Sequence, residues 1–175
     1  MVENGAIGFI FAIWAYLAAD LDDPFARSLG DRSFAVSVGQ TYVSRDRNSR
    51  EFRLSYLSPQ RIGPVQMMWD ASISDRGGVY LGYGGHLERD FSIGSVPAFA
   101  SASVLTGVWH QGDDVDLGFP IEFRTDLEVG VVMGDVWRVG IVTEHRSNMR
   151  IGGTFGDPVV NNGLESLSLR VTKRF

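Results

Sequence analysis

The sequence has no cysteine, a single lysine (Lys173) and no apolar run long enough for a transmembrane helix. Without cysteine, a disulfide scaffold, a thiol nucleophile and any thiolate-ligated metal centre are excluded. The net charge is −5, from 16 Lys+Arg against 21 Asp+Glu, which argues against a dedicated nucleic-acid-binding protein. The 175 residues are too few for an α/β barrel of roughly 250. A single domain of ordinary size is therefore expected.

The apolar run at the N-terminus covers residues 5–19 (GAIGFIFAIWAYLAA), fewer than the roughly 20 residues of a spanning helix. Its length and its small residues Ala18 and Ala19 are typical of a signal peptide, although Glu3 stands where basic residues are usual. We predict that residues 1–19 form a degenerate or truncated signal peptide and that residues 20–175 form one domain. A retained anchor or an apolar arm is the alternative.

Beyond Asp20 no helical stripe occurs, and apolar and polar residues alternate in segments of about ten, separated by Gly, Asp, Asn and Pro. This period of two predicts an all-β protein. Eight strands are expected, at Phe34–Ser44, Glu51–Ser58, Pro64–Ser72, Val79–Leu87, Phe91–Val104, Gly118–Val131, Val136–Ser147 and Leu164–Phe175.

Several strands have one apolar and one charged face. In the last three, the apolar face carries residues such as Phe123, Ile141 and Leu169, and the opposite face carries residues such as Arg124 and Glu144. Alternation by itself does not tell which face is inside. A soluble barrel would bury the apolar face, whereas a membrane barrel holds paired charges in its lumen and turns the apolar face to lipid.

The lengths of the links favour the membrane barrel. The links at residues 59–63, 88–90 and 132–135 are short, whereas those at 105–117 and 148–163 are long. Short turns on one rim and long loops on the other are typical of outer-membrane barrels, and Phe175 suits the interface at the closing end. We predict an eight-stranded antiparallel transmembrane β-barrel in the outer membrane of a Gram-negative bacterium, with a soluble β-barrel as the alternative.

Three residues suggest catalysis. His145 and Ser147 project from the same face of one predicted strand, and Glu165 lies on the same apolar face of the next. An imidazole activates a serine hydroxyl when a carboxylate fixes its tautomer. Oxyanion donors would come from Asn148, Gly152 or Gly153. The alternative is an inert, hydrogen-bonded histidine at the membrane boundary.

These residues stand in two motifs, Glu144-His145-Arg146-Ser147-Asn148 and Asn161-Asn162-Gly163-Leu164-Glu165-Ser166. The motifs resemble the HxSN and NxGxE signatures of the PagL family of outer-membrane lipid A 3-O-deacylases. The resemblance is specific over about the last third of the chain. It implies a catalytic triad of Ser147, His145 and Glu165, with Asn148 stabilising the oxyanion. Two features depart from the family: the stretch 148–160 is long, and Arg146 brings into the motif a charge that strand parity directs to the lumen.

The resemblance thus implies a serine esterase that removes the 3-O-linked acyl chain from lipid A of lipopolysaccharide, without a metal or cofactor. Lipopolysaccharide and membrane lipid are the expected partners, nucleic acid is not, and a homodimer stays open. The alternative function is a non-enzymatic eight-stranded outer-membrane barrel used for adhesion or as an envelope scaffold.

Overall fold

The computed structural model describes residues 25–42, 48–148 and 163–175. The predictions for residues 1–19 and for Gly152 and Gly153 lie outside these ranges. The described strands are β1 (Arg27–Leu29), β2 (Ser33–Tyr42), β3 (Ser49–Ile62), β4 (Val65–Ser74), β5 (Val79–Ile93), β6 (Val96–His110), β7 (Ile121–Met133), β8 (Trp137–Ser147) and β9 (Leu164–Arg174).

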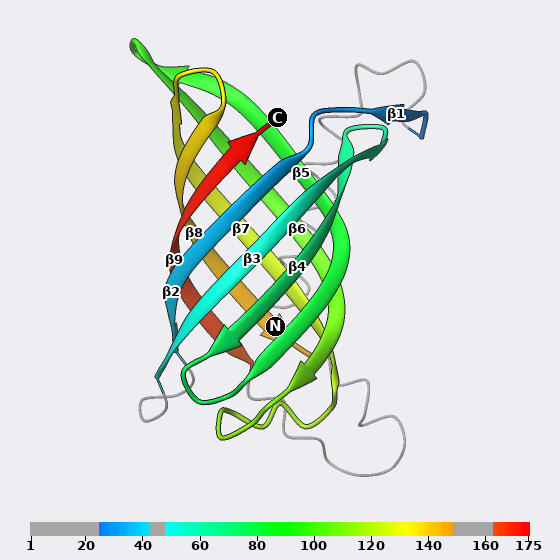
Figure 1. The fold of residues 1–175 in the computed structure, drawn as a ribbon, viewed down its shortest axis with the longest axis vertical. Coiled ribbons are helices and arrows are strands. Elements are labelled where there is room, and N and C mark those ends of the chain that lie inside the picture. The colour runs from blue at the N-terminus through cyan, green and yellow to red at the C-terminus, as the bar shows by residue number, and fades with distance from the viewer. Residues whose placement is uncertain (1–24, 43–47, 149–162) are drawn as a thin grey trace.

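Strands β2 to β9 form a closed antiparallel barrel (Figure 1). Each pairs with its neighbours in the chain, and β9 closes the ring on β2 over ten residue pairs, from Ser33↔Arg174 to Tyr42↔Glu165. The short β1 pairs with the last three residues of β3, beyond the part of β3 that pairs with β2. The eight-stranded antiparallel barrel predicted from alternation is confirmed.

Three tight turns lie at the end of the barrel that also holds the C-terminus (Figure 1). They join β3 to β4, β5 to β6 and β7 to β8, and each contains a glycine with positive φ: Gly63 at 54°, Gly94 at 61° and Gly134 at 63°. Glycine adopts this left-handed backbone without a steric penalty, so these positions define the short-turn rim.

The predicted turn at residues 88–90 is wrong. Strand β5 runs on to Ile93 and pairs with β6 throughout, and the turn follows at Gly94. Glu88 and Asp90 resemble turn residues in the sequence, but in the barrel they form ion pairs with Arg138. Strand β6 likewise extends to His110, so the long link that was predicted at 105–117 spans 111–120.

The barrel lumen is filled by charged side chains that neutralise one another. Arg53 is 2% exposed; its Nε donates to Asp70 at 2.7 Å and its Nη1 to Glu144 at 3.2 Å, and Asp126 is a third partner. Arg124 contacts Asp70, Glu51 and Glu144 in the same way. Buried charges are tolerated only when they are paired. These ion pairs therefore explain how the polar faces of the strands come to lie inside.

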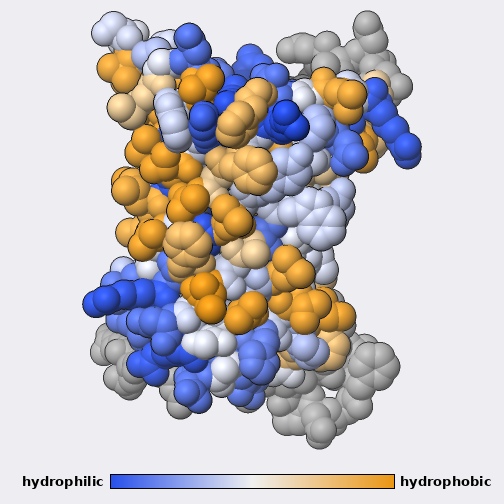
Figure 2. All heavy atoms as spheres, viewed as in Figure 1, coloured by the Kyte–Doolittle hydropathy of each residue, from blue (hydrophilic) through white to orange (hydrophobic). Residues whose placement is uncertain are grey.

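The apolar face lies outside. Val38, Val129, Ile141 and Leu169 form one cross-strand row and are each more than half exposed. Figure 2 shows hydrophobic residues gathered around the middle of the visible face and hydrophilic residues toward both ends. Such an exposed apolar band, on a barrel in which β9 closes on β2, is the surface that lipid covers in a membrane barrel. Within the described ranges, no helix has the length and apolar character needed to cross a bilayer.

We predict that Ile141→Arg, which puts a charge in the middle of the apolar band, lowers the free energy of unfolding in phospholipid vesicles by about 2–4 kcal/mol. Urea titration followed by tryptophan fluorescence measures this. Ser92→Arg, at an exposed position near the short-turn rim, is the control and should change the free energy little. An equal effect of both substitutions would contradict a lipid-facing band.

Candidate functional site

The pairing of β8 with β9 brings His145 directly opposite Glu165. Nδ1 of His145 lies 2.6 Å from Oε1 of Glu165, the distance of a charge-assisted hydrogen bond. The two side chains are 34% and 59% exposed, on the outer face of the barrel. With Nδ1–H donating to the carboxylate, the lone pair of the ring is on Nε2. The carboxylate therefore sets the tautomer that a general base needs. The long link 148–163 does not disturb this register.

Ser147 is the last residue of β8 and shares the outer face with His145, because alternate residues of a strand project to the same side. Its cross-strand partner on β7 is Phe123. Ser147 is only 3% exposed, so its hydroxyl is largely shielded from bulk water. Three of the four predicted site residues, Ser147, His145 and Glu165, thus lie at one end of the β8–β9 pair and belong to the outer face.

Asn148, the fourth predicted site residue, directly follows β8 and is fully buried. Its Nδ2 donates to the backbone carbonyl of Leu117 at 2.5 Å. Leu117 belongs to the link between β6 and β7, so this bond ties the end of β8 to a neighbouring loop. It also fixes the orientation of the side-chain amide beside the serine.

Gly163 is a site residue whose role the sequence analysis missed. It precedes β9 with φ 38°, and a Cβ at this position would lie 3.2 Å from Cε1 of His145. The glycine therefore leaves room for the imidazole ring. Its place in the motif two residues before Glu165 was the available signal, but only the structure shows which ring it faces.

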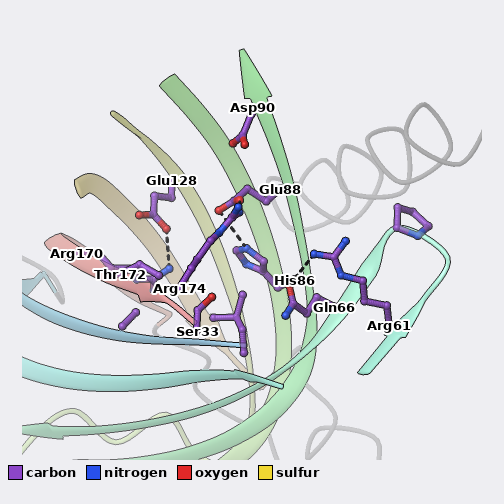
Figure 3. A pocket seen from close by; sticks show the side chains of 13 residues that line it. Ser33, Arg61, Gln66, His86, Glu88, Asp90, Glu128, Arg170, Thr172 and Arg174 are labelled. Atoms are coloured by element: carbon purple, nitrogen blue, oxygen red, sulfur yellow. Dashed lines mark hydrogen bonds and ion pairs between the residues drawn. The ribbon is translucent and has the colours of Figure 1, made fainter. Parts of the chain in front are cut away.

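The short-turn end of the lumen contains a separate polar cavity of about 230 Å³ (Figure 3). Its charged residues pair with one another: Arg170 with Glu128 at 2.9 Å, and Arg174 with Glu88. His86 also lines the cavity, is 5% exposed and forms a hydrogen bond with Ser103. Such a lining is unsuited to an acyl chain. None of Ser147, His145, Glu165 and Asn148 lines the cavity.

Among the described residues, no group of three or more His, Asp and Glu side chains is arranged to hold a metal ion. The described residues of the site offer a hydroxyl, an imidazole and a carboxylate. A serine on the same strand face as an imidazole that is oriented by a carboxylate is a combination suited to acyl transfer.

The chain matches the family model described as "Lipid A 3-O-deacylase (PagL)" over residues 25–174. No individual curated sequence matches the chain.

Solved structures agree on the fold. The crystal structure of the outer-membrane enzyme PagL is 18% identical, with a TM-score of 0.59, covering 81% of this chain and 98% of its own. Neisserial surface protein A is 14% identical, with a TM-score of 0.52 and coverages of 86% and 99%. A de novo designed transmembrane β-barrel is 10% identical, with a TM-score of 0.53 and coverages of 84% and 97%. At these identities the similarity concerns the barrel itself.

We predict that Gly163→Ala displaces the His145 ring and lengthens its bond to Glu165, because the added methyl group would press on Cε1 at 3.2 Å. In protein with ¹⁵N-labelled histidine, the Nδ1 proton of His145 should move upfield from the position of a short hydrogen bond. The control is Gly134→Ala. Gly134 has φ 63° and no atom within 4 Å of an added Cβ, so it imposes similar backbone strain without touching the ring. An unchanged Nδ1 resonance in Gly163→Ala would contradict the contact.

Proposed function

The chain belongs to the PagL family of lipid A 3-O-deacylases, and on that premise we propose that Ser147, His145 and Glu165 are its catalytic triad. The family makes the protein an ester hydrolase of the outer membrane that acts on lipid A. The observation that carries the assignment of the triad is the 2.6 Å contact between His145 Nδ1 and Glu165 Oε1, on the outer face that Ser147 shares.

The height of the site in the membrane supports this proposal. Trp137, at the other end of β8, is 44% exposed, and Lys173 Nζ lies 5.4 Å from its ring centroid, an arrangement typical of the membrane interface. His145 is eight residues further along β8. At about 3.3 Å per residue and a tilt near 40°, this spacing corresponds to roughly 20 Å along the membrane normal. The apolar band of such barrels is about 25 Å tall, so the site lies close to the outer interface, where the ester groups of a lipid are found.

The apolar wall below the site is suited to an acyl chain. Thr143, the next outward residue of β8, is flanked by Leu127 and Leu167, and the row with Ile141 and Leu169 follows toward the membrane centre. An acyl chain held along this wall stays in lipid while its ester reaches Ser147. The substrate then enters by lateral diffusion, without passing through the charged lumen.

The proposed reaction has two steps. In the first, Ser147 Oγ attacks the ester carbonyl while His145 Nε2 accepts its proton. Glu165 stabilises the imidazolium, which then returns the proton to the leaving 3-hydroxyl of the sugar. In the second step, His145 takes a proton from a water molecule, and the water oxygen attacks the carbonyl of the acyl-enzyme. The bond between the acyl group and Ser147 Oγ then breaks, and the imidazolium returns the proton to Oγ. The products are a free fatty acid and 3-O-deacylated lipid A. All three side chains come from one chain, so the reaction requires no second copy, and a homodimer remains a prediction.

We predict that Ser147→Ala abolishes release of the 3-O-linked hydroxyacyl chain, because no other group in the scheme forms the acyl-enzyme. Glu165→Gln should lower kcat by about 10²–10⁴-fold, since the amide no longer holds the required tautomer. Mass spectrometry of lipid A before and after incubation with the purified protein measures both.

Ser168→Ala is the control for these variants. Ser168 lies on β9 at a half-buried position that alternates with the outward Leu167 and Leu169, and its substitution should leave the rate unchanged. Full activity of Ser147→Ala would overturn the triad.

Asn148 is proposed as an oxyanion donor. Its Nδ2 donates to Leu117 O, which holds the side-chain amide at the end of β8 directly after Ser147. Its backbone N–H follows the nucleophile, the position that supplies an oxyanion donor in other serine hydrolases.

We predict that Asn148→Ala, which removes the amide side chain but keeps the backbone N–H, lowers kcat about 10²–10³-fold with little change in KM. Steady-state kinetics with a chromogenic ester in detergent separates the two constants. A variant with an unchanged kcat would assign the role to the backbone N–H alone.

A further inference from the structure

We propose that Arg146, the lumen-facing residue between His145 and Ser147, is a positioning residue that fixes the outer end of β8 and thereby the geometry of the base and the nucleophile. This inference rests on the proposed function of these two residues. Arg146 faces the lumen and touches no substrate in the scheme, so any effect it has on the reaction must act through the strand.

The guanidinium of Arg146 is fully buried and held by two carboxylates. Its Nη2 donates to Glu51 Oε1 at 2.7 Å and to Glu144 Oε1 at 2.7 Å, and its Nε donates to Glu144 Oε1 at 3.2 Å. Glu51 is on β3, which is separated from β8 by β9 and β2 in the strand order. The bond therefore ties the end of β8 across the barrel, in addition to its backbone ladders with β7 and β9.

Two aromatic rings hold the same group. The Arg146 guanidinium carbon lies 4.9 Å from the centroid of the Tyr80 ring and 4.7 Å from that of Trp109, both within the range of cation–π attraction. Tyr80 itself fits because Gly82 and Gly107 leave space for it: a Cβ at either glycine would come within 2.5 Å of Tyr80 atoms. The pocket for Arg146 is thus built by β3, β5, β6 and β8 together.

This anchor matters because of where β8 ends. Ser147 is the final residue of the strand, and strand ends open more readily than strand centres. With Arg146 fixed, the backbone on either side of it is fixed as well, and His145 and Ser147 project from that backbone on the outer face. A displacement of about 1 Å in a catalytic group can cost about 10²-fold in rate, so loss of the anchor should reduce kcat and leave lipid binding on the outer wall unchanged.

The test compares Arg146→Met with Arg170→Met in purified, refolded protein. Arg170 is a matched control because it is a buried lumen arginine, 2% exposed, with bonds to Ser37, Glu128 and Asp126. Its place on β9 is five residues beyond Glu165, toward the other end of the barrel. Folding is checked by heat-dependent electrophoretic migration, and kcat and KM are measured with a chromogenic ester.

We expect Arg146→Met to lower kcat about 10²-fold with KM within about threefold of the parent protein, and Arg170→Met to change kcat less than threefold. Arg146→Lys, which restores the charge without the planar fork, should recover part of the loss. Equal losses in both methionine variants, or an unchanged kcat in folded Arg146→Met, would overturn the positioning role. If Arg146→Met does not fold, Glu51→Gln replaces it: about a tenfold loss of kcat supports the anchor, and no loss overturns it.

Hydrogen exchange supplies a readout that does not depend on activity. In Arg146→Met the amides of residues 143–147 should exchange at least tenfold faster, whereas those of residues 137–141 should not change. Protection of 143–147 equal to that of the parent protein would overturn the anchor. Ser147→Ala separates the two proposals. Full activity in that variant refutes the triad but does not affect the exchange result for Arg146. An inactive Ser147→Ala together with a fully active Arg146→Met refutes only the positioning role.

Discussion

The pairing of arginines with carboxylates inside the lumen is the interaction on which the rest of the structure depends. Arg53, Arg124 and Arg146 are almost completely buried, and each is surrounded by carboxylates from several strands. A charge inside a barrel is tolerable only with such partners. Once most of the charged side chains on these faces are paired inside, the apolar faces must lie outside, and lipid is the solvent that suits them.

The same constraint determines where chemistry is possible. The lumen contains paired charges, and the cavity at its short-turn end is polar, so this cavity is unsuited to a lipid ester. On the outer face, a polar side chain is expensive within the apolar band and acceptable near the interface. His145 and Glu165 lie at that height and form a 2.6 Å contact. In the proposed reaction, the barrel therefore presents these groups on its outer face to a substrate that stays in the membrane.

Much of this could be predicted from the sequence, because a strand's alternation is local. The eight-stranded barrel followed from it, and so did the shared outer face of His145 and Ser147. The turn predicted at residues 88–90 is wrong because the local pattern does not contain the partners of these residues. Glu88 and Asp90 look like solvated turn residues, and only the closed barrel shows that Arg138 pairs with them. Contacts across the lumen could not be predicted, since Glu51 and Arg146 are 95 residues apart. For the same reason, the space that Gly163 leaves for the His145 ring was visible only in the structure.

A crystal structure of the protein after reaction with a long-chain alkyl phosphonate is the most direct test of the proposed triad. We expect a bond between phosphorus and Ser147 Oγ, with the alkyl chain lying outside the barrel against Leu167 and Leu169. A phosphonate bound to a different side chain, or an alkyl chain that enters the lumen, would contradict it.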